Sequence, residues 1–471
     1  MVANIFFGSK EVSSKELTHR VSPYSGEIVS SSAVCSADDA NRALLIAKEA
    51  AKEARKSTIS QRCEWLLDVA KKLKENREDI AKTITDEVGK PIAFARVEVD
   101  RCIETVTISA ETMRTMHGET INTDATISGK KTTAFFIRES AGVVVAITPF
   151  NFPLNLVAHK LAPALVAGNS VVLKPTPEAP LTAYKFAKLF IESEYAIKDA
   201  LSVVYGDAEV GNALITSDIP RVISFTGSVP VGNIITKNAG IKKISLELGG
   251  NAATYIDESA DLDLAASRCV MGAFVNSGQV CISLQRIYVN AKIYDAFAQK
   301  MADETKKLVV GSPYEEDTFM GPLIDEEACS RAMEWVESAI EEGAIAMLPP
   351  RKEGRLFYPC VMSNVRDDMA IVCEEVFAPI VSLVRVESFD DALPRINNSP
   401  YGLQFSIFTN DLSITKRAIY ELDAGGVVIN DMPTLRFDIQ PYGGVKLSGV
   451  GREGPRFAIE EMSEIKSIVI C

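Results

Sequence analysis

The spacing of hydrophobic and polar residues changes near residue 132, and the change separates two kinds of predicted structure. Alanine, lysine and glutamate dominate residues 37–118, which favours helices, and Gly89-Lys90-Pro91 interrupts the pattern before a further helix. From residue 132 onward the chain instead shows short apolar runs. The run from Gly142 to Ile147 is continuous, which is typical of a strand buried on both faces of a parallel sheet.

Short predicted strands then alternate with helices. Strands are expected at 132–138, 142–147, 170–174, 201–205 and 221–225, with helices starting near 153, 181 and 208. Regular alternation of this kind predicts a doubly wound parallel sheet, whose ligand site lies beyond the carboxyl ends of the strands. A second alternating α/β region runs from about 250 to 430. The stretch 464–470 is a further strand, and we expect it to pair with a neighbouring segment or with another subunit.

Composition restricts the classes of protein to which the chain can belong. Its 471 residues are too many for one ordinary core, so two or three domains are expected. The net charge of −13 argues against a nucleic-acid partner. No apolar run is long enough for a membrane span and no secretory signal is evident, so we expect a cytoplasmic enzyme without a membrane partner. Nine scattered cysteines without a CxxC pair, and only three histidines, predict no metal site.

Two positions carry candidate catalytic chemistry. Cys281 ends the segment Asn276-Ser277-Gly278-Gln279-Val280-Cys281, and Glu247 begins Glu247-Leu248-Gly249-Gly250-Asn251. A thiol nucleophile needs a stabilised oxyanion and a base that activates water to release the acyl group, and Glu247 is a candidate for that base. Because an ordinary thiol is mostly protonated at neutral pH, the site is expected to lower the pKa of Cys281. Taken alone, the pair favours the ordinary alternative of a buried packing cysteine and a surface acid, so the interpretation depends on the motifs around the two positions.

A nucleotide site is expected at one edge of the predicted sheet. There is no GxGxxG motif, but Phe225-Thr226-Gly227-Ser228 follows a strand and opens a helix. Gly227 allows close approach of a ligand to the backbone, Ser228 offers a hydroxyl, and the helix N-terminus favours a phosphate. Lys174 ends another strand at the same edge, where its amine can bond ribose hydroxyls. An ordinary tight turn and a rim lysine are the alternatives for these residues.

Seven motifs, taken in order, resemble those of the NAD(P)-dependent aldehyde dehydrogenases. They are Phe150-Asn151-Phe152-Pro153, Lys174-Pro175, Phe225-Thr226-Gly227-Ser228, Glu247-Leu248-Gly249-Gly250-Asn251, Gly278-Gln279-Val280-Cys281, Glu374-Glu375-Val376-Phe377-Ala378-Pro379 and Pro441-Tyr442-Gly443-Gly444-Val445-Lys446-Leu447-Ser448-Gly449. The resemblance covers nearly the whole chain. It implies an α/β aldehyde dehydrogenase fold with a Rossmann-like, doubly wound cofactor domain (1–118 and 140–247), a second α/β catalytic domain (248–440) and a β oligomerisation arm (119–139 and 452–471). It also implies a homo-oligomer, either a dimer or a tetramer.

The resemblance gives three residues a catalytic role. Cys281 matches the nucleophile, Glu247 matches the general base, and Asn151 matches the amide that holds the oxyanion together with the Cys281 N–H. An aldehyde would be oxidised to its acid through a thiohemiacetal and a thioester. A CoA-acylating enzyme is one alternative, although a base for water would be counterproductive there. A catalytically silent scaffold, like the crystallins recruited from enzymes, is another.

The resemblance also identifies residues for the cofactor, which is NAD or NADP. Gly227 and Ser228 match the pyrophosphate turn, Lys174 and Glu375 match the residues that hold the riboses, and Phe377 matches an aromatic residue near the nicotinamide.

Two departures from the family pattern also lie on the cofactor side. Phe150 stands where the family has tryptophan, which is a mild change in size. Many NAD-using members carry a glutamate three positions after the lysine, but here that position is Pro177, with Glu178 one position further. Without that acid in place a 2′-phosphate would be tolerated, so the choice between NAD and NADP stays open.

The substrate is expected to be short. The chain looks most like the archaeal lactaldehyde dehydrogenase branch, which is close to the non-phosphorylating glyceraldehyde-3-phosphate and phosphonoacetaldehyde dehydrogenases. Relatives that act on anionic aldehydes often line the substrate tunnel with arginines, and Arg101 and Arg436 are candidates for this role. The alternative for Arg101 is a surface ion pair with Glu98 or Glu104. Val280 stands where several phosphate- or phosphonate-handling relatives have arginine, so we favour lactaldehyde, glyceraldehyde or succinate semialdehyde.

Overall fold

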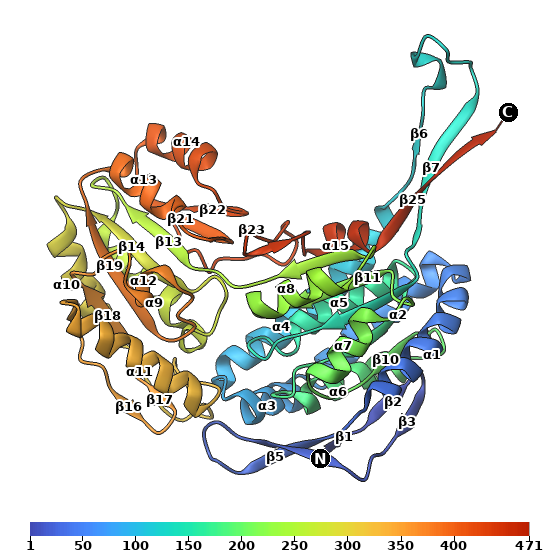
Figure 1. Cartoon of the computed structure of the whole chain (residues 1–471), viewed down its shortest axis with the longest axis horizontal. Helices are drawn as coiled ribbons and strands as arrows, with labels where there is room; N and C mark the ends of the chain where they lie inside the picture. Colours follow the sequence, from blue (N-terminus) through green and yellow to red (C-terminus); the bar gives the residue numbers. More distant parts are fainter. Residues whose placement is uncertain (471) are drawn as a thin grey trace.

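An eight-stranded sheet forms the centre of the first structural unit (Figure 1). The computed structural model describes residues 1–470. The strand order is β24 (Gly449–Val450), β12 (Lys243–Glu247), β11 (Val222–Thr226), β8 (Val143–Ile147), β9 (Ser170–Lys174), β10 (Leu201–Val203), β2 (Ile5–Phe7) and β3 (Lys10–Val12). The five inner strands are parallel, as predicted, whereas β24, β2 and β3 pair antiparallel at the two edges. These edge strands were not predicted, because they are too short to show a period.

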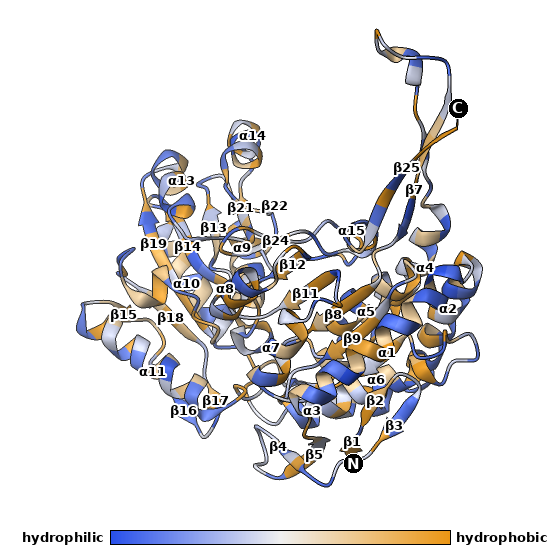
Figure 2. Cartoon of the chain, turned by 45° about the vertical axis from the view of Figure 1, so that its right-hand side comes forward, coloured by the Kyte–Doolittle hydropathy of each residue, from blue (hydrophilic) through white to orange (hydrophobic). Residues whose placement is uncertain are grey.

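Helices connect and cover the inner strands of this sheet. The connecting helices are α5 (Asn155–Val166), α6 (Pro180–Ile191), α7 (Ala208–Thr216) and α8 (Val229–Asn238). The helical stretch predicted at 37–118 is confirmed as α1 (Ala37–Lys56), α2 (Ile59–Glu75), α3 (Arg77–Val88) and α4 (Ile92–Thr115). Helix α5 begins two residues after the predicted start and is buried along its whole length. The sheet is therefore enclosed, and the apolar runs of β8, β9 and β11 lie at its centre (Figure 2).

The strand order reverses between β8 and β11, and this reversal positions the site. From β8 the chain moves through β9 to β10, and it then returns to place β11 and β12 on the opposite side of β8. The carboxyl ends of β8 and β11 are adjacent, since Phe225 pairs with Ile147. Connections leave this point in opposite directions, which opens a crevice suited to a ligand.

A seven-stranded sheet forms the second unit, as the alternating pattern from 250 to 430 predicted. Its order is β15 (Ile345–Ala346), β18 (Cys360–Ser363), β19 (Ile380–Val386), β14 (Leu284–Asn290), β13 (Ala252–Ile256), β21 (Gln404–Phe408) and β22 (Gly426–Ile429). All pairs are parallel except that of β15 with β18. The helices of this unit are α9 (Leu262–Phe274), the short 3-10 turn η2 (Val275–Gly278), α10 (Tyr294–Thr305), α11 (Glu326–Glu341), α12 (Ala370–Cys373), α13 (Phe389–Asn397) and α14 (Leu412–Glu421).

A three-stranded ribbon extends away from both units (Figure 1). It contains β6 (Glu119–Thr120), β7 (Thr133–Ser140) and β25 (Ser463–Ile470), and β25 pairs antiparallel with β7 over its whole length. The strand predicted at 464–470 is thus present, and its partner belongs to the same chain. Helix α15 (Pro455–Glu461) packs on α4 and α5, so only the end of the segment 452–471 lies in the ribbon. Its role in oligomerisation stays a prediction.

The remaining strands form small sheets. One contains β1 (Val2–Ala3), β5 (Ile28–Ala33) and β4 (Leu17–Val21), and the others are the pairs of β16 (Lys352–Glu353) with β17 (Leu356–Phe357) and of β20 (Tyr401–Gly402) with β23 (Val445–Lys446). A short 3-10 turn, η1, spans Thr123–Ala125. Among residues 1–470, no helix is both long and apolar enough to cross a membrane, and no cluster of side chains is arranged to hold a metal ion.

Candidate active site

A cavity of about 700 Å³ lies at the strand reversal and contains most of the predicted site residues. Residues of both structural units line it, so the site is formed where the two units meet. The predicted residues that line it are Arg101, Phe150, Asn151, Gly227, Ser228, Glu247, Val280, Cys281, Glu375, Phe377 and Arg436. Lys174 and Glu178 do not line this cavity.

The loop that carries Cys281 is held in an unusual backbone conformation. Asn276, Ser277 and Gly278 follow one another with φ of 52°, 55° and 72°, in the left-handed region that side chains other than glycine rarely adopt. Gly278 has no alternative, because a Cβ there would lie 2.3 Å from the Ala378 carbonyl oxygen. The Ser277 hydroxyl donates to the Gly321 carbonyl at 2.8 Å and ties the loop down. The chain reverses sharply here, and the reversal turns Cys281 into the cavity.

The thiol of Cys281 contacts the hydroxyl of Tyr442, with Sγ and Oη 3.1 Å apart. Burial raises the pKa of Cys281 to about 12, and the hydrogen bond from Tyr442 and the charge of Arg436 oppose this increase. The expectation of a lowered pKa is therefore wrong for this structure, because desolvation in an apolar cavity outweighs the groups that favour the thiolate. The thiol is protonated at neutral pH in this state.

Asn151 presents its amide to the same loop. Its Nδ2 donates to the Gln279 carbonyl at 3.0 Å, which leaves the second amide proton for another acceptor. A buried ion pair fixes the backbone on either side, since Lys90 donates to the Asn151 carbonyl at 2.7 Å and is paired with Glu98. Glu98 also accepts hydrogen bonds from the N–H groups of Leu154 and Asn155 at the start of α5. Asn151 is consequently not a helix cap, because Glu98 satisfies those groups.

Glu247 is a buried carboxyl group with no hydrogen-bond partner for either oxygen within residues 1–470. It ends β12, and only 3% of its surface is exposed. Burial raises its pKa well above the usual value, and the nearby negative charge of Glu453 raises it further. A buried carboxyl group without a hydrogen-bond partner costs folding free energy, and such groups are typical of functional sites.

The opposite part of the cavity fits a dinucleotide. Helix α8 begins after Ser228, whose side chain makes no capping bond, so its hydroxyl and the N–H groups of the first turn are available to an anion. Glu375 accepts a hydrogen bond from the Gly250 N–H at 3.0 Å, and burial raises its pKa to about 7. Phe150 and Phe377 meet edge to face, with ring centroids 6.0 Å apart. A helix N-terminus, a carboxyl group and two aromatic rings thus line this part of the cavity.

Lys174 and Glu178 lie beside the cavity rather than in it. Lys174 ends β9 next to Ile147 of β8, and burial lowers its pKa. Its amine makes no hydrogen bond or ion pair with any residue that the structure describes, although the side chain is mostly enclosed. Glu178 is half-buried and accepts a hydrogen bond from the Thr176 hydroxyl, whereas Pro177 is exposed. Among the described residues, Lys174 therefore keeps a free amine at the end of its strand, whereas the carboxylate of Glu178 already accepts a hydrogen bond.

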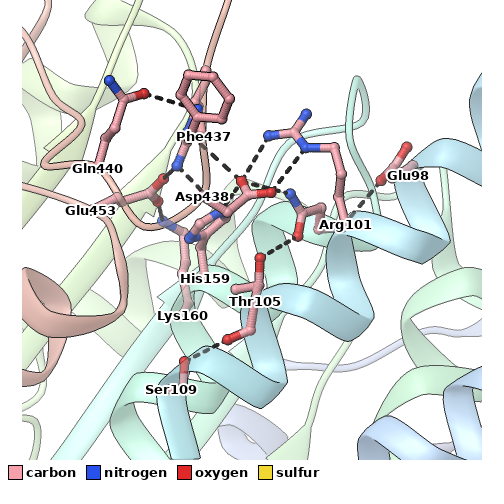
Figure 3. A network of polar contacts seen from close by, with 12 residues as sticks. Glu98, Arg101, Thr105, Ser109, His159, Lys160, Phe437, Asp438, Gln440 and Glu453 are labelled. Carbon is pink, nitrogen blue, oxygen red and sulfur yellow. Dashed lines mark hydrogen bonds and ion pairs between the residues drawn. The ribbon is translucent and has the colours of Figure 1, made fainter. Parts of the chain in front are cut away.

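Arg101 and Arg436 are both engaged in a network of charged side chains, and Figure 3 shows Arg101 beside Asp438 in this network. Arg101 forms a bidentate pair with Asp438, at 2.7 and 2.9 Å, instead of the alternative partners Glu98 or Glu104. Although burial acts to raise it, hydrogen bonds from His159 and Arg101 hold the pKa of Asp438 well below its usual range. Arg436 donates to Glu453 at 3.2 Å. Neither guanidinium group is a free cation here, although Arg101 keeps 27% of its side chain exposed.

Sequence reasoning missed several residues of this network. Lys160 and Glu453 form a fully buried ion pair, with Nζ and Oε1 3.0 Å apart. His159 and Lys160 interrupt a helix, α5, that is otherwise apolar after Asn155, and this anomaly is a signal that the sequence contained. Tyr442 was visible only as part of a late motif. Its contact with Cys281 depends on a chain separation of 161 residues, which no local pattern reveals.

Comparison with known proteins gives a consistent result. The model of a family described as the aldehyde dehydrogenase family matches residues 10–468. A 3-sulfolactaldehyde dehydrogenase from Priestia aryabhattai is 44% identical over 93% of this chain and 91% of its own length. A lactaldehyde dehydrogenase from Methanocaldococcus jannaschii is 40% identical over 96% of each chain. The crystal structure of an NADP-dependent glyceraldehyde-3-phosphate dehydrogenase from Bacillus halodurans, complexed with NADP, superposes with a TM-score of 0.97, at 34% identity, over 100% of this chain and 99% of that chain.

Proposed function

Because the chain belongs to the aldehyde dehydrogenase family, we propose that it oxidises a short aldehyde to its carboxylic acid through a covalent intermediate on Cys281. The observation that carries the proposal is the meeting of a thiol, a free amide proton and an unpaired carboxyl group in one cavity, beside the N-terminus of α8. NAD or NADP is the proposed cofactor, and when bound it accepts the hydride that leaves the substrate carbon.

The residues of the chain have separate tasks in this reaction. The thiol of Cys281 first loses its proton to solvent, and the resulting thiolate attacks the aldehyde carbon and forms a C–S bond, while the carbonyl oxygen becomes an oxyanion. The second amide proton of Asn151 and the backbone N–H of Cys281 hold this oxyanion, and loss of one such donor typically raises the barrier by about 3–4 kcal/mol. Departure of the hydride leaves a thioester. Glu247 then takes a proton from water, which adds to the thioester carbon and releases the acid and the thiol.

Several contacts support the binding of a dinucleotide beside Cys281. Ser228 and the first turn of α8 would hold the pyrophosphate, and Lys174 and Glu375 would hold the two riboses. Phe377, in contact with Phe150, would limit the movement of the nicotinamide. The position of Pro177 gives no acid for a 2′-hydroxyl, so we propose that NADP is accepted as well as NAD.

We propose a small substrate with a hydroxyl or a single anionic group. Lactaldehyde, glyceraldehyde and succinate semialdehyde are the first candidates, and the named activity of the Priestia relative adds 3-sulfolactaldehyde. Val280 contributes an apolar wall beside the nucleophile, so the cavity has no cation next to Cys281 at that position. Arg101, which is partly exposed, and Arg436 are the proposed contacts for the far end of an anionic substrate.

The test is a panel of these aldehydes with NAD and with NADP, followed by the absorbance of the reduced nicotinamide. Cys281→Ala should abolish cofactor reduction, whereas Cys373→Ala, which removes another half-buried thiol, should leave it unchanged. Unchanged turnover in Cys281→Ala would refute the proposal. Formation of acyl-CoA instead of the acid when CoA is added would contradict the role given to Glu247.

A further inference from the structure

Tyr442 is held against Cys281 by contacts on three sides. Its hydroxyl lies 3.1 Å from the sulfur. Its backbone N–H donates to the Glu453 carbonyl at 3.1 Å, and its carbonyl accepts from the Glu453 N–H at 2.6 Å. The guanidinium group of Arg436 covers the ring, with Cζ 3.7 Å from the ring centroid. The tyrosine is buried, with only 5% of its surface exposed. Its hydroxyl is thus a fixed part of the surroundings of the sulfur.

We infer that Tyr442 is a further catalytic residue, which donates a hydrogen bond to the thiolate of Cys281, and that Arg436 is a positioning residue that holds and polarises the tyrosine ring. The inference deepens the proposed function, because it rests on Cys281 as the nucleophile. It also gives Arg436 a second role, since the same residue was proposed above as a contact for the far end of an anionic substrate.

The chemistry of the three groups fits this assignment. A thiolate is an acceptor only, so the Tyr442 hydroxyl must donate when the sulfur is ionised. Burial raises the pKa of Tyr442 well above its usual value, which keeps the hydroxyl protonated at neutral pH. A cation over the ring face withdraws electron density and strengthens the O–H donor. The proton that leaves the thiol passes to solvent, and the tyrosine keeps its own.

The charges behind Arg436 explain why it stays in place. Its Nη2 donates to Glu453 at 3.2 Å, and Glu453 is in turn paired with Lys160 at 3.0 Å. Glu453 therefore acts at two points: its backbone pairs with the backbone of Tyr442, and its carboxylate holds the guanidinium group that covers the tyrosine ring. An arginine suits this position better than a lysine, since only a planar guanidinium stacks on the ring while it bonds a carboxylate.

The test is the rate at which iodoacetamide alkylates Cys281, measured by mass spectrometry of its peptide. Loss of a hydrogen bond to a charged group raises the thiol pKa by about one to two units, and because a more basic thiolate is also more nucleophilic, Tyr442→Phe should slow alkylation about four- to fifteen-fold between about pH 7 and 9. Arg436→Lys should slow it in the native background and make no further difference when combined with Tyr442→Phe. Tyr294→Phe, which removes a buried hydroxyl in α10, is the matched control and should not alter the rate.

Equal rates in Tyr442→Phe and the native enzyme would overturn the inference. A faster rate would overturn it too, because the hydroxyl would then only cover the sulfur. Should Tyr442→Phe fold poorly by circular dichroism, Arg436→Lys alone decides, and an unchanged rate would refute the assignment. Alkylation needs no turnover, so this result is independent of the test of Cys281→Ala, which addresses the proposed function.

Discussion

Replacement of Glu453 by glutamine should destabilise the protein strongly, since this carboxylate lies at the centre of the buried charge network. Burial acts to raise the pKa of Glu453, but Lys160, His159 and Arg436 outweigh it and lower the value from 4.5 to about 2. At 1.36 kcal/mol for each pH unit, this difference corresponds to about 3 kcal/mol of stability at neutral pH. Because the folded-state pKa is lowered, the contribution is complete above about pH 5 and is lost as the pH falls toward 2.

The assay is urea unfolding followed by tryptophan fluorescence, which comes from Trp335 and from Trp65, buried in α2. All variants are compared at one protein concentration and at pH 7. Glu453→Gln should lose about 3 kcal/mol or more, because it also leaves the ammonium group of Lys160 buried without a partner. The double variant Glu453→Gln with Lys160→Met should regain much of this loss, since no unpaired charge then remains in place of the ion pair.

A loss below about 1 kcal/mol in Glu453→Gln would refute the reasoning, because it would mean that the network contributes no more than an exposed ion pair. A double variant whose loss of stability equals the sum of the losses in Glu453→Gln alone and Lys160→Met alone would also refute it. That result would show that the two charges act independently.

Three other substitutions test separate parts of the site. Glu247→Gln should trap the acyl thioester on Cys281, detectable by mass spectrometry. Because burial raises the pKa of Glu247, the thermal midpoint of this variant should increase relative to that of the native enzyme as the pH rises above about 4.5. A difference in midpoint that does not change with pH would contradict this expectation. Lys174→Met should raise the KM for the cofactor about tenfold, in line with the loss of a hydrogen bond to a charged group, and leave the KM for the aldehyde unchanged; equal effects on both would contradict its place at the ribose. Gly278→Ala should abolish cofactor reduction, since its Cβ would lie 2.3 Å from the Ala378 carbonyl oxygen, and normal activity would contradict the account of the nucleophile loop.

The parallel cores of both units were predictable because their strands are buried on both faces. The run of β8 has no polar interruption, and its burial confirms the pattern. The antiparallel edges were not predictable in the same way. Strand β24 contains two residues and pairs with β12 only because the C-terminal segment returns to the sheet. This pairing depends on tertiary structure and not on the local sequence. Propensity cannot detect an element of that length.

The candidate site followed the same division between local and distant information. Asn151, Glu247 and Cys281 stand in motifs with distinctive neighbours, and the structure brings all three into one cavity. The charge states could not be predicted, because they depend on burial and on residues far away in the chain. The raised pKa of Cys281 and the pairing of Arg101 with Asp438, 337 residues away, are both of this kind.

The long chain separations around Cys281 determine when during synthesis this protein becomes reactive. The sulfur is made 161 residues before the hydroxyl that contacts it. Glu247 is likewise made before Gly449, the residue of β24 with which it pairs. Domains fold in order as the chain leaves the ribosome, so the first unit can form while the second is still incomplete. A nascent chain that ends before Tyr442 carries its cysteine without the hydroxyl that we infer stabilises the thiolate, so its sulfur gains full reactivity only after the C-terminal segment has been made.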